Sequence, residues 1–92
     1  MASFLYTPEP DEQIVIVKPR GEYWLLKELQ ELVGGYIEVV RTIDGRFMVI
    51  NEKGKLHRLP LNKQATRVYQ HGLVDPIVGP ALIVDTRKEL DE

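Results

Sequence analysis

The sequence predicts an α+β domain in which helices pack on a small mixed sheet, in the order β-α-β-β-β-α-β. Three observations support this class. Asp44-Gly45 separates two runs of strand-forming residues, apolar residues recur at helical spacing before Gly34, and Ile14 to Val17 is a continuous β-branched run. A second helical pattern follows Asn62. We therefore expect two helices against one sheet.

The first strand is expected at Ile14-Val15-Ile16-Val17, closed by Pro19 and Gly21. Apolar side chains on both faces are typical of a strand that is buried on both sides, so this strand is expected in the middle of the sheet or under a helix. The preceding residues 1–12 include the stretch TPEPDE, which is rich in proline and acid. We expect these residues to form a flexible arm outside the core.

The first helix is expected between Tyr23 and Val33. Its apolar residues recur at helical spacing, with charged and polar residues on the other side; they are Leu25, Leu26, Leu29, Leu32 and Val33. Gly34-Gly35 ends the helix, because glycine accepts the left-handed conformation of a C-terminal cap. These glycines do not form a dinucleotide-binding loop, since such a loop follows a strand and opens a helix.

A hairpin is expected to pair residues 36–42 with residues 46–51 around Asp44-Gly45, a dipeptide that accepts the positive φ angles of a tight primed turn. Asn51 to Gly54 predicts a second turn. Residues 55–59 then return as a short third strand of a meander, which Pro60 ends.

The second helix is expected to begin after Asn62, a good N-cap residue, and to continue to His71 before Gly72 closes it. The last strand is expected over Ile77-Val78 and residues 81–84, interrupted by Gly79-Pro80. The charged residues 86–92 are expected to be flexible.

The apolar pattern also predicts which side chains are mostly buried: Leu25, Leu29, Leu32, Ile37, Val39, Val49 and Val68. One alternative architecture stays open. A helix followed by short, bent strands is also how small five-stranded RNA-binding barrels of the Sm type begin. The ten-residue helix before the last strand departs from that pattern.

Composition limits the classes of protein to consider. Ninety-two residues with 43% hydrophobic content allow a single domain, residues 1–92. The chain has no cysteine, which favours a reducing compartment, and we expect a soluble cytoplasmic protein without a signal peptide or membrane partner. A small sheet with a two-faced strand would gain core by pairing an edge strand with another copy, so we expect a homo-oligomer.

The net charge of −2 hides a segregation along the chain. Residues 1–40 carry three basic and seven acidic side chains, residues 41–71 carry seven basic and two acidic, and residues 72–92 carry two basic and five acidic, giving −4, +5 and −3. A basic middle between acidic ends can form an anion site, or it can pair with the acidic parts of the same chain.

The second helix is where the sequence gives the clearest sign of a binding site. Lys63, Arg67 and His71 follow one another at intervals of four on one face, and Arg58 lies just upstream. Two or three of these basic side chains and the free N–H groups after Asn62 could converge on a phosphate or another anion. The candidate ligand-binding residues are Arg58, Asn62, Lys63, Arg67 and His71. They could equally be solvated surface charges paired with Glu12, Glu38 or Glu52.

No residue set in the sequence indicates catalysis or a metal site. His57 and His71 fit no short ligand motif, and no cysteine is present to complete a tetrahedral set. Asp44 is explained by the hairpin turn, and Ser3, the only serine, lies in the N-terminal arm. We expect no enzyme, no catalytic residues, no metal and no cofactor.

Five of the seven aromatic residues, at positions 23, 24, 36, 47 and 69, can build a core or a stacking surface. A platform for single-stranded nucleic acid needs aromatic and basic residues interleaved on one face. Tyr36 and Phe47, near Arg41 and Arg46, approach this pattern. The alternation of side chains along the strands does not decide whether they face solvent.

Three short motifs follow one another along the chain: ELVGGYIE, NEKGK and LPLN, with a late apolar run after an aspartate. With them the chain resembles an uncharacterised family of small proteins from bacteriophages and their bacterial hosts, a domain of unknown function that shows the same motifs. The resemblance spans residues 15–84 and implies no activity.

We expect a non-catalytic phage-type accessory protein that binds a small anionic ligand, such as a nucleotide, or a host protein through the basic helix start. The alternative is a nucleic-acid-binding protein that uses the same basic middle on RNA, with the Sm-like barrel as its structural version.

Overall fold

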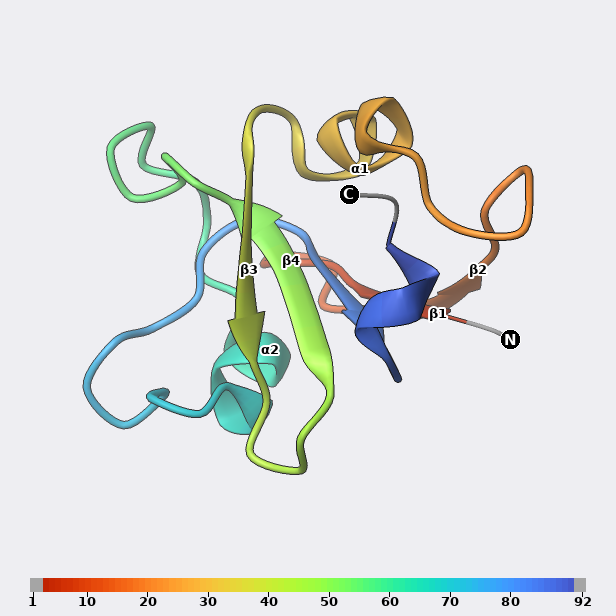
Figure 1. Ribbon diagram of the computed structural model, residues 1–92. Coiled ribbons are helices and arrows are strands. Elements are labelled where there is room, and N and C mark those ends of the chain that lie inside the picture. Colours follow the sequence, from red (N-terminus) through yellow and green to blue (C-terminus); the bar gives the residue numbers. More distant parts are fainter. Residues whose placement is uncertain (1–2, 91–92) are drawn as a thin grey trace.

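A five-stranded antiparallel sheet forms the centre of the computed structural model, which describes residues 3–90 (Figure 1). In chain order the elements are β1 (Ser3–Tyr6), β2 (Ile14–Val17), α1 (Leu26–Val33), β3 (Ile37–Arg41), β4 (Phe47–Asn51), α2 (Lys63–Val68), β5 (Ala81–Val84) and a short 3-10 turn, η1 (Arg87–Glu89). The spatial order of the strands is β2-β1-β5-β4-β3. The predicted α+β class, with helices packed on a small sheet, is confirmed.

The predicted hairpin is confirmed as β3 and β4. Val39 pairs with Val49, and the pairing runs from Ile37 opposite Asn51 to the turn. Gly45 has a φ of 86°, the left-handed conformation that favours glycine. The turn is held by Thr42, whose hydroxyl donates to Asp44 and accepts from the backbone N–H of Arg46.

Helix α1 covers one face of the sheet, and Gly34 caps it in the left-handed conformation at φ 81°. The core beneath α1 is made of side chains from the helix, the segment before it, two strands and the residue after η1: Trp24, Leu29, Val33, Val49, Leu82, Val84 and Leu90. Of the residues predicted to be buried, Leu29 and Val49 are fully buried and Val39 partly, but Leu25 is 49% exposed. Leu25 precedes the first helical turn, so the helical pattern does not apply to it.

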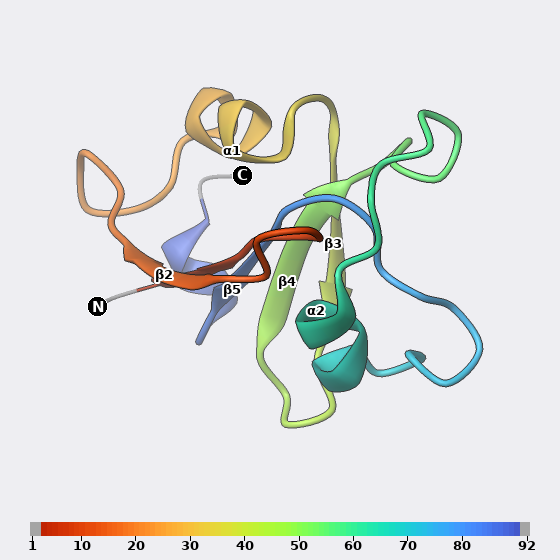
Figure 2. The same cartoon turned by 180° about the vertical axis from the view of Figure 1, so that it is seen from behind.

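Helix α2 covers the opposite face (Figure 2). A second set of core residues lies there: Tyr6, Met48, Ala65, Ile77, Ala81 and Ile83. Successive residues of β4 and β5 therefore alternate between the two cores, as the two-residue period of a strand requires. The helix ends at Val68, three residues earlier than the sequence predicts, because Tyr69 adopts an extended conformation and bridges to Thr42, the residue after β3.

Two strands differ from the prediction. Residues 55–59 form no strand, because residues 55–58 lie in turns. The additional strand is β1, which lies in the predicted flexible arm and pairs with β2 and β5. A four-residue strand next to a proline-rich stretch has little local signal, and its partner in β5 is about 80 residues away along the chain. All four strand pairings are antiparallel, whereas the sequence suggested a mixed sheet.

The position of β2 also differs from the prediction. The strand lies at the edge of the sheet, next to β1, and Ile14, Val15 and Ile16 are 50%, 38% and 64% exposed. The central strand is β5, in which all four residues are buried. A continuous apolar run can belong to a central strand or to an edge with an uncovered surface, and periodicity does not separate the two.

Residues 86–90, part of the stretch that the sequence predicted to be flexible, contain the η1 turn and a core residue. Leu90 packs in the core, and the Glu89 carboxylate accepts hydrogen bonds from the backbone N–H groups of Asp85 and Thr86, both at 3.0 Å. Residues 1–2 and 91–92 of the predicted flexible ends lie outside the described part of the chain.

The Sm-like barrel is not formed by residues 3–90. The sheet is open, with β2 and β3 as its two edges, and a helix packs on each face. Among the helices that the structure describes, none has the length and apolar character to cross a membrane.

Candidate ligand site

Asn62, a predicted ligand residue, is fully buried at the start of α2. Its side-chain oxygen accepts a hydrogen bond from the backbone N–H of Ala65 at 3.1 Å. Its side-chain nitrogen donates to the carbonyl oxygens of Tyr6 at 2.8 Å and Gly79 at 2.9 Å. The amide is therefore used inside the protein, as an N-cap and as a link between distant segments.

The four basic side chains predicted at the site do not gather around one cavity with Asn62. Lys63 forms an ion pair with Glu9 at 3.1 Å, and the Glu9 carboxylate raises the pKa of Lys63. His71 packs edge-on against Tyr69, with ring centroids 5.6 Å apart. Arg67 lines a shallow hollow of about 460 Å³ that none of the other four lines. Arg58, at φ 55°, lies in the turn after β4.

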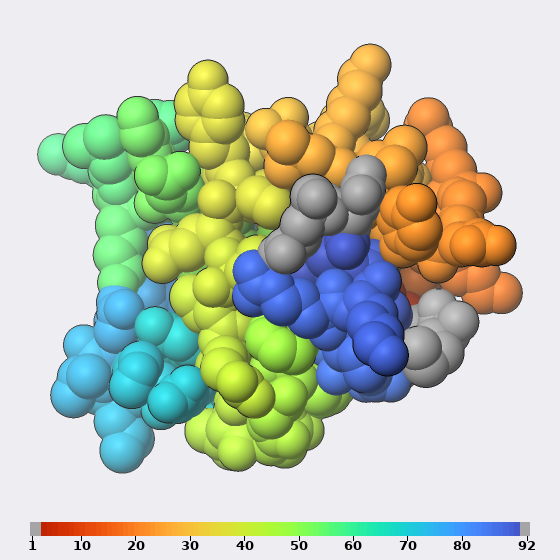
Figure 3. Space-filling view, in the orientation of Figure 1, coloured from red at the N-terminus to blue at the C-terminus, as the bar shows by residue number. Residues whose placement is uncertain are grey.

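The segment that follows β4 stands out from the body of the molecule (green in Figure 3). We call residues 51–58, which begin at the last residue of β4, the NEKGK loop. Within it, three basic side chains at positions 53, 55 and 58 outnumber the single carboxylate of Glu52, giving +2 with His57 neutral. Part of the basic middle of the chain is thus displayed on one protruding loop.

Asn51 ties the NEKGK loop to the end of α1. Its side-chain nitrogen donates to the carbonyl oxygen of Val33 at 3.1 Å, and its oxygen accepts from the backbone N–H of Lys53 at 2.8 Å. A Cβ on Gly35 would lie 3.0 Å from that nitrogen, so a residue without a side chain suits this position. The backbone N–H of Glu52 also donates to the carbonyl oxygen of Tyr36 at 2.9 Å. The motifs ELVGGYIE and NEKGK therefore hold each other in place.

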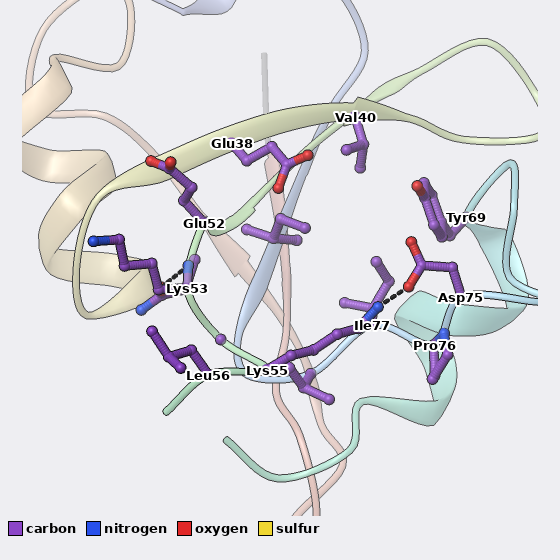
Figure 4. Close-up of a pocket in the computed structure, with 14 residues that line it drawn as sticks. Glu38, Val40, Glu52, Lys53, Lys55, Leu56, Tyr69, Asp75, Pro76 and Ile77 are labelled. Carbon is purple, nitrogen blue, oxygen red and sulfur yellow. Dashed lines mark hydrogen bonds and ion pairs between the residues drawn. The ribbon is translucent and has the colours of Figure 1, made fainter. Parts of the chain in front are cut away.

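One hollow, of about 200 Å³, lies on the side of the NEKGK loop that faces α2. Figure 4 shows Lys55 paired with Asp75 in this hollow, with Glu38 and Tyr69 among the residues that line it. Its charges are mixed, and it is smaller than the roughly 300 to 1,000 Å³ of most ligand pockets. Of the two lysines that line it, Lys55 is already paired with Asp75.

A second hollow, of about 330 Å³, lies on the side of the NEKGK loop that faces α1. We call it the Tyr36 hollow; it is lined by Gln30, Gly35, Tyr36, Asn51, Lys53 and His57. The Tyr36 side chain is 67% exposed, although core packing is the usual role of a tyrosine next to a strand. No carboxylate is among these six residues, and Lys53 supplies a positive charge. The hollow therefore combines an open aromatic ring with a cation.

The stacking platform suggested by Tyr36 and Phe47 is not formed as one surface. Phe47 packs against the core under α1, and the guanidinium of Arg41 lies over its ring at 5.0 Å. Tyr36 precedes the opposite end of the hairpin, near Asn51. Of these two rings, that of Tyr36 is the one presented to solvent in a hollow.

Residues 3–90 contain no group of three or more histidine, aspartate, glutamate or cysteine side chains that could hold a metal ion. Asp44 is engaged with Thr42 and Arg46 in the hairpin turn. His57 lines the Tyr36 hollow, where the six lining residues include no carboxylate to orient it as a general base.

The match to known families covers nearly the whole chain. Residues 4–92 match the family described as a domain of unknown function, DUF3846. The chain belongs to this family. No curated protein and no solved structure matches it. The family description names no ligand for this DUF3846 protein.

One feature of the sequence points to the Tyr36 hollow once the hairpin is in place. The hairpin register places Ile37 opposite Asn51, so the GGY and NEK segments meet at the open end of the hairpin. What the sequence could not show is that the Tyr36 ring faces solvent, because the tyrosine lies just outside β3 and the strand alternation does not extend to it.

Proposed function

We propose that the protein is a non-catalytic binding protein for a small anionic ligand with an aromatic ring, such as a nucleotide, and that the Tyr36 hollow is the site. The single observation that supports this most is the 67% exposed Tyr36 ring in a hollow shared with Lys53 and His57. A tyrosine ring offers a stacking surface for a base, and a lysine offers a charge for a phosphate.

The size and rigidity of the Tyr36 hollow suit this role. Its volume of about 330 Å³ is at the lower end of the range of small-molecule pockets. The hydrogen bonds of Asn51 to Val33 and Lys53 fix two of its walls, so little ordering would be needed on binding.

The basic helix start is a weaker candidate than the sequence suggested. The Asn62 side chain is buried and hydrogen-bonded within the protein, Lys63 is paired with Glu9, and α2 has only six residues. We therefore propose the Tyr36 hollow beside the NEKGK loop, and not the start of α2, as the anion site. We further propose, from the sequence motifs alone, that the protein is an accessory factor of a phage-type genome that acts in the cytoplasm.

The test is isothermal titration calorimetry with a panel of mono- and dinucleotides at low salt. At least one member of the panel is expected to bind the wild type, and Tyr36→Ala is expected to weaken that binding by about fivefold or more, because base stacking on an aromatic ring contributes about 1 to 3 kcal/mol. Absence of binding by the wild type to every member would refute the proposal.

Single-stranded RNA is the second candidate ligand, because the same hollow offers a stacking ring beside the basic NEKGK loop. Binding of a short RNA with a steep dependence on salt, together with no binding of free nucleotides, would favour this alternative. A host protein as the ligand would be indicated if neither class of nucleotide ligand binds.

A further inference from the structure

The outer edge of β2 is an uncovered apolar strand. Ile14, Val15 and Ile16 are all exposed, and among the described strands β2 pairs only with β1. In Figure 2 the strand lies away from α2, which covers the other half of that sheet face. An edge strand with three exposed β-branched residues is a template for pairing with another strand.

The other edge of the sheet is protected. β3 carries Glu38 and Arg41, and the chain after α2 lies along its end. There the backbone N–H of Ile43 donates to Val68 at 2.8 Å, and the N–H of Gln70 donates to Arg41 at 3.0 Å. Charged residues and a covering segment are usual means of blocking an edge strand. Within the described chain, β2 has neither along its exposed residues.

The hydrogen bonding of β2 shows which of its backbone groups are open. Thr7 donates from its backbone N–H to the carbonyl oxygen of Gln13 at 2.7 Å, and the pairing continues with Leu5 opposite Val15. Backbone groups of an antiparallel strand alternate between its two neighbours. The backbone N–H and C=O groups therefore face β1 at Gln13, Val15 and Val17. Those of Ile14 and Ile16 face the open edge.

The charges that flank β2 indicate what would pair with it. Asp11 and Glu12 precede the strand, and Lys18 and Arg20 follow it. If a second copy of the strand lies antiparallel, the acidic end of each copy meets the basic end of the other. A parallel arrangement would place like charges together, which is unfavourable. The flanks of β2 are thus complementary to β2 itself.

We propose that the protein forms a homodimer by antiparallel pairing of β2 with β2 of a second copy, which joins the two sheets into one of ten strands. Because Ile14 and Ile16 carry the open backbone groups, the register places Ile14 opposite the second copy's Ile16, with Val15 on the two-fold axis. The acidic turn that precedes β2 in each copy then lies at the end where Lys18 follows β2 of the other copy.

This dimer is independent of the Tyr36 hollow. β2 forms one edge of the sheet, and the β3–β4 hairpin lies at the other edge. In Figure 1 the NEKGK loop projects away from β2. Pairing through β2 therefore leaves both copies of the hollow open, and failure of the dimer would not affect the proposed function.

The test is the molar mass in solution, measured by sedimentation equilibrium across micromolar concentrations. The wild type is expected at twice the chain mass of 10.6 kDa. Ile16→Lys is expected to raise the dissociation constant of the dimer by about tenfold or more. The substitution is present in both copies, so each lost contact is lost twice across the two-fold interface. Leu73→Lys is the matched control, because Leu73 is fully exposed elsewhere, and it should not change the mass.

A second variant separates pairing from folding. Ile16→Pro removes an N–H that faces outward, so the pairing with β1 is kept while the pairing with the second copy is lost. A circular dichroism melt checks that each variant is folded. A monomeric wild type, or a dimer that Ile16→Lys and Ile16→Pro leave intact, would overturn the proposal, as would a dimer that Leu73→Lys dissociates. If Ile16→Pro does not fold, Ile16→Lys decides.

Discussion

The side-chain nitrogen of Asn62 donates a hydrogen bond to the carbonyl oxygen of Tyr6 at 2.8 Å, across 56 positions of the chain. The same nitrogen reaches the carbonyl oxygen of Gly79 at 2.9 Å. One amide thus joins the start of α2 to β1 and to the turn before β5. The asparagine of the LPLN motif has a structural reason to be there, as does Asn51 of NEKGK, and neither needs a ligand to explain it.

Replacing Asn62 tests this role. Asn62→Ala removes the N-cap and takes one hydrogen-bond donor from each of two carbonyl groups, so we expect a loss of about 2 to 5 kcal/mol in the free energy of unfolding. Asn62→Asp keeps the cap acceptor but turns a carboxylate toward two carbonyl oxygens, and it should destabilise the protein as well. The measurement is urea denaturation. A midpoint unchanged by either substitution would contradict the arrangement.

The core under α1 gives a second prediction. Leu29 is 1% exposed and packs against strands β4 and β5, so Leu29→Ala should cost about 2 to 5 kcal/mol. The matched control is Leu25→Ala four residues earlier, where the side chain is 49% exposed and much less apolar area is lost. Equal shifts of the denaturation midpoint for the two variants would show that the core is placed wrongly.

The hairpin and the first helix could be predicted because their signals are local. Asp44-Gly45 specifies a turn type, and Gly34 specifies the end of a helix, whatever the rest of the chain does. β1 could not be predicted, because its pairing with β5 depends on residues near the other end of the chain. β2 was correctly predicted as a strand but was expected in the middle of the sheet, whereas it lies at the edge. Its apolar residues do not indicate which strand or helix packs beside them.

The candidate site was less predictable than the fold. Charge patterning located the basic middle, but it did not show that Glu9 would neutralise Lys63, because residues 1–12 were expected to lie outside the core. The Tyr36 hollow depends on the meeting of α1, the hairpin end and the NEKGK loop. Such a meeting is a property of tertiary structure, which propensity and periodicity do not contain.

The Asp44 carboxylate in the hairpin turn is expected to make the stability of the protein depend on pH in the acid range. The Thr42 hydroxyl, followed by the Arg46 guanidinium, lowers the pKa of Asp44 from 3.8 to about 2. A group with a lowered pKa in the folded state stabilises the fold above its unfolded pKa and loses this effect as pH falls toward its folded pKa. The difference in stability between wild type and Asp44→Asn should be constant from pH 7 to about pH 5 and shrink between about pH 4 and 2.

The measurement for Asp44 is a series of urea denaturation curves across this pH range. The comparison with Asp44→Asn removes the contribution of the other carboxylates, which titrate in both proteins. A difference that stays constant down to pH 2 would mean that the Asp44 carboxylate does not have its lowered pKa.

Gly72 makes a close approach that excludes any side chain. A Cβ at this position would lie 1.9 Å from the carbonyl oxygen of Thr66 in α2. Gly72→Ala should therefore destabilise the protein by about 1 to 3 kcal/mol or more. Gly21→Ala is the control, because a Cβ there meets nothing within 4 Å, and its melting temperature should stay the same or rise slightly. A neutral Gly72→Ala would show that the turn after α2 is not packed as described.

The last prediction separates the two places where an anion could bind. Lys53→Glu reverses the charge in the Tyr36 hollow, and Arg67→Glu makes the same change on α2, outside that hollow. If the hollow is the site, Lys53→Glu should weaken nucleotide binding by about tenfold or more, because it replaces an attractive charge with a repulsive one beside the phosphate. Arg67→Glu should have a much smaller effect, and raising the salt concentration should weaken the binding of the wild type. Calorimetry at two salt concentrations measures all three. The opposite result, in which Arg67→Glu abolishes binding and Lys53→Glu does not, would return the site to the basic start of α2, where the sequence first indicated it.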